Sequence, residues 1–244
     1  MIKKTILSTV AALTLASGMA FSDDIDIVFI GKNTGNPYFD SLTQGFVEAC
    51  DVIACNFEFV APATAEATSQ IPFIEAQIQR GVDVIAISPN SPDALNQVFD
   101  AARAKDILVL TVNGDITGNE EHRDATILPT DFTKVGADQV EMVGSLIGYE
   151  GEIAILSATT EAPDQNFWIE GMNKTLETDS KYSKMTLVAT VYGDDQPEKS
   201  TTEMESLLAN FPNLKGVIAP TTVGIAAGAQ VVQSRGISDT VKVT

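Results

Sequence analysis

The 244-residue sequence predicts an α/β fold of two lobes, each built on a parallel β-sheet covered by helices. From residue 25 onward, short runs rich in β-branched residues alternate with segments of helical periodicity. Several of these runs are continuously apolar, which is typical of parallel strands buried on both faces. Two such series occur, separated near Leu128-Pro129-Thr130. We therefore expect lobes over residues 23–128 and 131–244, joined by a hinge crossing at 129–130.

The first 22 residues have the features of a secretory signal peptide. Lys3 and Lys4 precede the apolar run Ile6–Ala16, and small residues follow it, with cleavage expected after Ala20 or Ser22. The apolar run is too short for a transmembrane helix, which needs about 20 residues. The sequence thus predicts export to an oxidising, extracytoplasmic compartment.

Composition excludes several functional classes. The formal net charge of −18 would repel nucleic acids and anionic membrane surfaces. One His and two Cys leave little from which a transition-metal site could be built, and no cofactor-binding motif is found. Neutral or cationic small partners remain.

The strands are expected in the apolar runs, in chain order. Their ranges are Ile25–Ile30, Asn56–Val60, Val84–Ser88, Ile107–Thr111, Ala125–Leu128, Glu152–Leu156, Thr186–Val191, Gly216–Ala219 and Thr240–Thr244. Connections between successive parallel strands are right-handed crossovers, so the intervening helices cover the faces of each sheet.

The helices between them have readable start signals. Asn36-Pro37 and Ser91-Pro92 each predict an N-cap followed by proline at the first helical position. Pro72 fits only the first turn of the next helical pattern, so that helix is expected to begin later than its apolar stripe suggests. Another helix is expected from about Pro197.

Two further features concern the chain's covalent structure. Cys50 and Cys55 lie at the end of a predicted helix and the start of the next strand, so they form either a disulfide or two buried free thiols. The sequence stops at the strand pattern Val241–Thr244 with no helix behind it to cover the sheet, which predicts that the second lobe is incomplete.

Candidate binding residues lie in the loops that follow the strands, because ligands of open parallel sheets collect at the carboxyl ends of strands. The loop after the first strand lacks the glycine spacing of phosphate-binding loops, but it supplies a cation, amides and two aromatic side chains. Three other loops supply amides, carboxylates and hydroxyls. The candidates are Lys32, Asn36, Tyr38, Phe39, Asn113, Asp115, Asp164, Gln165, Asn166, Pro220, Thr221 and Thr222.

Signals for catalysis are weak. His122 lies in a charged run and is interpreted as solvated, and no nucleophile has an adjacent base. Asp194 and Asp195 are interpreted as a solvated turn, and Trp168 as a core residue. The sequence therefore predicts a binding protein and not an enzyme.

Five segments resemble the type I periplasmic sugar-binding proteins of ABC importers, in particular the subgroup that binds rhamnose and autoinducer-2. The segments are GKNTGNPYFD at 31–40, GVDVIAIS at 81–88, ILSATTEAPDQNFW at 155–168, VYGDD at 191–195 and IAPTTVG at 218–224. The resemblance implies two Rossmann-like lobes that close on a sugar, a periplasmic location, delivery to a membrane permease, and a monomer.

The same resemblance implies roles for the candidate residues. Lys32 matches a polar anchor, Tyr38 and Phe39 match aromatics that cover the sugar, and Asp164 and Gln165 match a polar pair. Asn113 stands where autoinducer-2 binders have aspartate, and Thr222 where they have a small apolar residue. These departures favour a methyl-bearing deoxyhexose such as rhamnose. Autoinducer-2 uptake or chemotaxis sensing is the alternative.

Overall fold

The computed structural model describes residues 24–244. The predicted signal peptide at residues 1–22 lies outside the described residues. Within residues 24–244, no helix is both long and apolar enough to cross a membrane.

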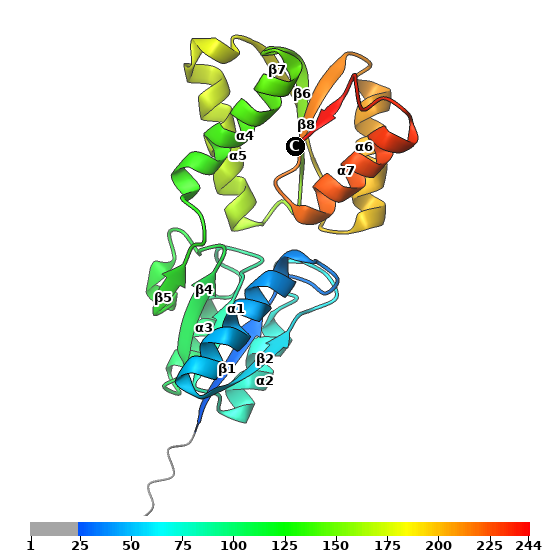
Figure 1. Ribbon diagram of the computed structural model, residues 1–244. Helices are drawn as coiled ribbons and strands as arrows, with labels where there is room; N and C mark the ends of the chain where they lie inside the picture. The colour runs from blue at the N-terminus through cyan, green and yellow to red at the C-terminus, as the bar shows by residue number, and fades with distance from the viewer. Residues whose placement is uncertain (1–23) are drawn as a thin grey trace, which may run out of the picture.

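The first lobe is a five-stranded parallel sheet with the strand order β2-β1-β3-β4-β5 (Figure 1). Its elements are β1 (Ile25–Ile30), α1 (Tyr38–Ile53), β2 (Cys55–Val60), α2 (Ile71–Arg80), β3 (Val84–Ile87), α3 (Asn96–Arg103), β4 (Leu108–Val112), the 3-10 helix η1 (Glu120–His122) and β5 (Ala125–Ile127).

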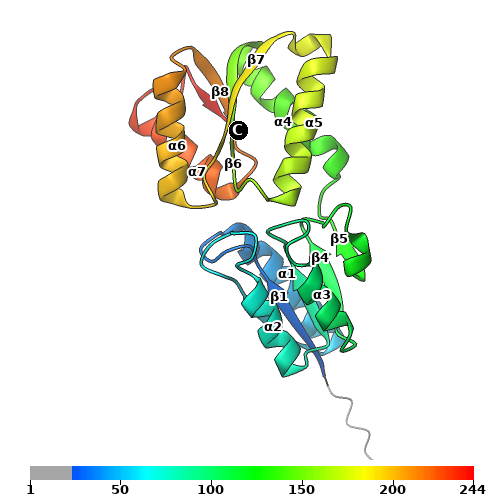
Figure 2. The same ribbon diagram turned by 180° about the vertical axis from the view of Figure 1, so that it is seen from behind.

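Helices cover both faces of this sheet. Because side chains alternate along a strand, Val28 and Ile30 of β1 join the core beneath α2 and α3, whereas Phe29 points to the opposite face. There it packs against Phe39 and Phe46 of α1. Helix α1 lies in front of the sheet in Figure 1, and α2 and α3 lie in front of it in Figure 2, which is the view from behind.

The second lobe is a four-stranded parallel sheet with the order β7-β6-β8-β9. Its elements are α4 (Phe132–Ile147), β6 (Glu150–Ser157), α5 (Pro163–Thr178), the 3-10 helix η2 (Ser180–Tyr182), β7 (Lys184–Tyr192), α6 (Pro197–Asn210), β8 (Leu214–Ile218), α7 (Thr222–Ser234) and β9 (Lys242–Val243). Helices α4 and α5 pack on one face, and α6 and α7 on the other. The predicted α/β class with two parallel sheets is confirmed.

Close helix packing in the second lobe depends on glycine. Helices α4 and α5 cross at Gly136 and Gly171, where a Cβ added to Gly136 would lie 2.5 Å from the carbonyl oxygen of Trp168. No side chain fits at that distance, so glycine sets how closely the two helices approach. This contact positions the first turn of α5, which carries three of the candidate residues, Asp164, Gln165 and Asn166.

Three helix starts differ from the sequence prediction. Helix α1 begins at Tyr38, one residue after Pro37, while the side chain of Asn36 accepts a hydrogen bond from the Tyr38 amide at 3.2 Å. Helix α2 begins at Ile71, so Pro72 is in its first turn and the later start was wrong. Helix α3 begins only at Asn96, because the Ser91 hydroxyl accepts from the amides of Asp93 and Ala94 in a preceding turn.

The strand ends shift by a few residues. Strands β6 and β7 are longer than predicted, and β9 is limited to Lys242–Val243. Pairing with β7 extends β6 past the apolar run at both ends, because Glu150, Gly151 and Ser157 pair with that strand.

Of the two alternatives left open for the cysteines, the disulfide is the one observed. Cys50, in the last turn of α1, is bonded to Cys55 at the start of β2, and their Cα atoms are 4.7 Å apart. The tight connection places Ala54 in the left-handed region at a φ of 55°.

Candidate ligand-binding site

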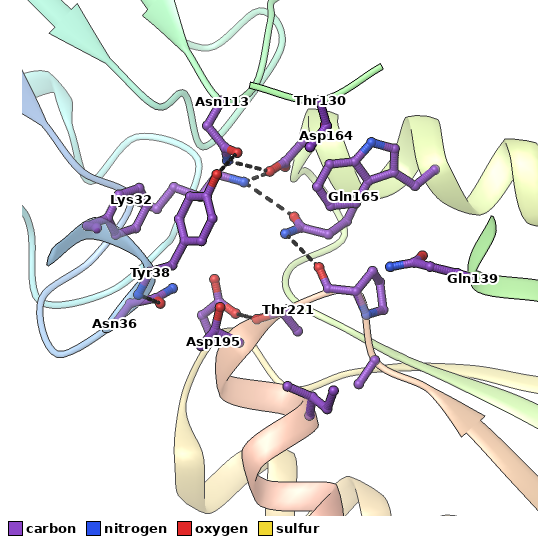
Figure 3. A pocket seen from close by; sticks show the side chains of 16 residues that line it. Lys32, Asn36, Tyr38, Asn113, Thr130, Gln139, Asp164, Gln165, Asp195 and Thr221 are labelled. Carbon is purple, nitrogen blue, oxygen red and sulfur yellow. Dashed lines mark hydrogen bonds and ion pairs between the residues drawn. The ribbon is translucent and has the colours of Figure 1, made fainter. Parts of the chain in front are cut away.

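A cavity of about 320 Å³ lies between the two lobes. Loops that follow β1, β4, β6, β7 and β8 contribute its walls, as expected for the carboxyl ends of parallel strands. Figure 3 shows polar side chains from both lobes directed toward one another. The lining residues are Lys32, Asn36, Tyr38, Phe39, Asn113, Thr130, Gln139, Asp164, Gln165, Trp168, Asp195, Ala219, Pro220, Thr221, Thr222 and Ile225.

A buried ion pair joins the lobes at this cavity. Lys32, from the loop after β1, donates to Asp164 Oδ1 in the first turn of α5, and the two side chains are only 3% and 1% exposed. Lys32 Nζ also lies 3.3 Å from Gln165 Oε1. Charges of opposite sign are paired here because an isolated charge is costly to remove from water.

Asn113 continues this network from the end of β4. Its Nδ2 donates to Asp164 Oδ2 at 3.1 Å, and its Oδ1 accepts from the Tyr38 hydroxyl at 2.6 Å. Burial raises the pKa of Tyr38, and the negative charge of Asp164 raises it further, so the phenol stays protonated and donates. The backbone of Asn113 has a φ of 68°, a conformation that asparagine tolerates better than most residues.

Asp195 lies on the opposite wall, in the loop between β7 and α6. Its Oδ1 accepts from the Thr221 hydroxyl, and its main-chain oxygen accepts from Asn33 Nδ2 of the first lobe at 3.2 Å. Burial raises the pKa of Asp195, partly opposed by the Thr221 hydrogen bond and by the positive charge of Lys32. Asp194 points elsewhere and pairs with Lys199.

Aromatic and apolar side chains complete the cavity. Phe39 is buried against Phe29, with ring centroids 6.0 Å apart. The Trp168 ring packs edge-on against Phe132 at 5.1 Å while also lining the cavity. Faces of this kind suit the C–H surfaces of a small ring.

Ten of the twelve candidate residues lie in the cavity, and two lie outside it. Asp115 forms a bidentate pair with Arg123, with both distances 2.6 Å, and also accepts from Thr111. Although burial alone raises its pKa, these hydrogen bonds hold it below the usual range, so Asp115 fixes its own loop. Asn166 follows Gln165 on α5 and is rotated away from the cavity, where it donates to the Thr160 carbonyl at 2.8 Å.

Several residues that line the cavity were not predicted from the sequence. The solvated-turn interpretation was wrong for Asp195, which is 4% exposed, although its position after a strand could have identified it. Trp168 combines the predicted packing with a place in the cavity wall. Thr130 comes from the segment that connects β5 to α4, and Gln139 comes from α4, where the strand-end rule does not apply. Among residues 24–244, no group of His, Cys, Asp and Glu is arranged to hold a metal ion.

Two parallel-sheet lobes with a polar cavity between them define a class of two-lobed small-molecule binding proteins. The chain belongs to the periplasmic binding protein family: the family described as "Periplasmic binding protein domain" matches residues 27–244. Membership in a family of binding proteins agrees with the prediction that the chain is not an enzyme.

Three comparisons illustrate its relatives. An ABC transporter solute-binding protein from Clostridium phytofermentas, solved with L-rhamnose, is 35% identical, with a TM-score of 0.86 over 90% of this chain and 68% of that one. The xylose/arabinose-binding protein of Sulfolobus acidocaldarius is 25% identical over 86% of this chain. LsrB from Clostridium saccharobutylicum, solved with AI-2, is 21% identical with a TM-score of 0.84, covering 90% of this chain and 69% of that one.

These relatives bind different small molecules, so the rhamnose and autoinducer-2 subgroup is one neighbour among several. At 21% identity, the likeness to LsrB shows a shared fold alone. This chain spans about half the length of the Sulfolobus protein, 53%.

Proposed function

We propose that this protein is the periplasmic sugar-binding component of an ABC importer, which binds a neutral monosaccharide between its lobes and delivers it unaltered to a membrane permease. The observation that carries the proposal is the cavity of about 320 Å³, lined by polar side chains of both lobes. Export through the predicted signal peptide and the family membership support the location.

Size and chemistry favour a single sugar ring. Pockets for small ligands span about 300–1,000 Å³, and this cavity is at the lower end of that range. Amides, hydroxyls and carboxylates supply hydrogen bonds for ring hydroxyls, and Phe39 and Trp168 supply apolar faces. The cation in the lining, Lys32, is already paired with Asp164, so the lining has no unpaired cation to bind an anionic ligand.

Within this class, we propose a deoxyhexose such as rhamnose as the ligand. The relative that is 35% identical was solved with L-rhamnose. Asn113 and Thr222 both line the cavity, and both depart from the residues that the autoinducer-2 binders carry at these positions. Thr222 adds a hydroxyl that can bond to a sugar, and Asn113 replaces a carboxylate with a neutral amide that can both donate and accept.

Ligand-stabilised closure is the proposed mechanism. A sugar in the cavity contacts both lobes only when they are together, so it shifts the population toward the closed form that the permease recognises. Each charge-assisted hydrogen bond to a hydroxyl contributes about 1.5–3 kcal/mol.

The test is calorimetric titration of L-rhamnose, D-xylose, D-ribose, D-arabinose and autoinducer-2 into the protein. We expect L-rhamnose to bind most tightly, and Asp164→Ala to weaken binding about tenfold or more, since it removes a buried charged partner. The exposed Asp51→Ala on α1 is the control and should change affinity by less than about twofold.

Tighter binding of another sugar would revise the ligand and keep the class. No heat with any sugar would overturn the proposed function. Unchanged affinity in Asp164→Ala would remove Asp164 from the site.

A further inference from the structure

Among the residues that the structure describes, the carboxylate of Asp195 has one oxygen that takes part in a hydrogen bond and one that does not. Its side chain is 4% exposed and lines the cavity, with Oδ1 bonded to the Thr221 hydroxyl (Figure 3). The other carboxylate oxygen, Oδ2, receives no hydrogen bond from any residue in the described range 24–244. Oδ2 therefore has an acceptor position free for a hydrogen bond from a ligand in the cavity.

The second carboxylate of the cavity is bonded differently. Asp164 accepts from Lys32 at Oδ1 and from Asn113 at Oδ2, so its charge is balanced and both of its oxygens have partners. The lining therefore contains one cation and two carboxylates, and the negative charge without a paired cation is that of Asp195. The neighbouring Lys199 pairs with Asp194 instead.

The backbone at Asp194 and Asp195 has an unfavourable conformation. Asp194 and Asp195 are consecutive non-glycine residues in the left-handed region, with φ values of 54° and 52°. Such conformations persist where the surrounding structure imposes them and cluster at ligand-binding sites. Here the turn directs one aspartate to Lys199 and the next into the cavity.

We propose that Asp195 is a specificity-determining residue of the cavity, whose Oδ2 accepts a hydrogen bond from a hydroxyl of the bound sugar and whose charge excludes sugars carrying a carboxylate or phosphate. This inference rests on the proposed sugar-binding function. A hydroxyl bonded to a carboxylate forms one of the stronger hydrogen bonds. An anionic sugar would instead bring a second negative charge close to that of Asp195, with no free cation in the lining to balance it.

The experiment compares L-rhamnose, D-xylose and D-ribose with the anionic sugar D-glucuronate by calorimetric titration. The variants are Asp195→Asn, which keeps the shape and removes the charge, and Asp195→Gly, which removes the side chain and suits a positive φ. Asp194→Asn is the matched control, because it makes the same change one residue away on the same turn. Thermal melting of each unliganded variant checks that it folds.

We measure each variant with the neutral sugar that the wild type binds best. We expect Asp195→Asn to lower the affinity for this sugar by about tenfold or more, and Asp195→Gly to lower it at least as much. Asp194→Asn should stay within about twofold. D-glucuronate should neither bind the wild-type protein nor compete with the neutral sugar.

Unchanged affinity in both folded Asp195 variants would overturn the proposed hydrogen bond between Asp195 and the sugar. An equal loss of affinity in Asp194→Asn would overturn it as well. Binding of D-glucuronate with an affinity similar to that of the neutral sugar would overturn the exclusion of anions. If no neutral sugar binds the wild type, the proposed function itself fails, and this inference fails with it.

Discussion

At the scale of single residues, Asn113 combines a backbone role with a side-chain role. Its φ of 68° lets the chain turn sharply after β4, and its amide group bridges Tyr38 and Asp164 across the cavity. The two roles are separable, because glycine satisfies the backbone without supplying the amide. Lys32 acts mainly through its side chain, which carries the charge that balances Asp164, while its main-chain oxygen accepts from Asn90 Nδ2 at 2.9 Å.

We expect Asn113→Ala to be less stable than Asn113→Gly by about 1 kcal/mol, because a Cβ is disfavoured in the left-handed region. Both variants lose the amide and should weaken sugar binding alike. Urea unfolding of the unliganded variants measures the difference in stability. Calorimetric titration with the sugar measures the loss of affinity. Equal stability of the two variants would show that the positive φ imposes no cost at this position.

At the scale of elements, the second lobe is fastened by a charged cluster away from the cavity. Glu141 of α4 accepts from Lys181 Nζ at 2.6 Å, from the Tyr182 hydroxyl at 2.7 Å and from the Tyr149 hydroxyl at 2.9 Å. These bonds, led by the one from Lys181, lower the pKa of Glu141 to about 2, and burial and the Glu141 bond raise that of Tyr182 to about 12. The cluster ties α4 to η2 and to the start of β6.

This cluster predicts an acid-dependent loss of stability. A lowered pKa means that the folded state favours the ionised carboxylate, so the stabilisation is complete above the ordinary value of 4.5 and is lost as the pH falls toward 2. We expect wild-type protein to lose more unfolding free energy than Glu141→Gln between about pH 5 and pH 2. Urea unfolding across this range measures both. Parallel pH profiles would contradict the assignment.

At the scale of the whole molecule, the lobes are held together partly by contacts that do not line the cavity. Asn33 is 4% exposed, and its Nδ2 donates to the main-chain oxygen of Asp195 in the other lobe at 3.2 Å. Asn33 is absent from the cavity lining, so it stabilises closure without a place for ligand contact. Binding energy and closure are coupled through such bonds.

We therefore expect Asn33→Ala to weaken sugar binding by about two- to tenfold, as the loss of one hydrogen bond of about 0.5–1.5 kcal/mol implies. Small-angle X-ray scattering of the unliganded variant should show a larger radius of gyration than the wild type, with the difference removed by saturating sugar. Asn56→Ala, which removes an exposed bond to Asp26 within the first lobe, should leave both quantities unchanged. Identical scattering and affinity in the Asn33 and Asn56 variants would contradict this role of Asn33.

The sequence by itself determined the α/β class, the order of the strands along the chain and most of the cavity residues. Strand burial and the strand-end rule are local properties, and a run such as Val84–Ile87 carries its pattern wherever it lies. The fold also followed, because repeated crossovers leave few topologies.

Only the tertiary structure decided which polar side chains meet. Asp115 follows a strand, yet its pairing with Arg123 keeps it out of the cavity. Asn166 is next to the lining residue Gln165, yet its hydrogen bond to the Thr160 carbonyl keeps it outside as well. Asp195 looked like a surface turn and is buried, because two successive left-handed residues rotate its side chain into the cavity. Side-chain direction at a loop depends on backbone angles and partners from distant segments, and no local pattern encodes either of these.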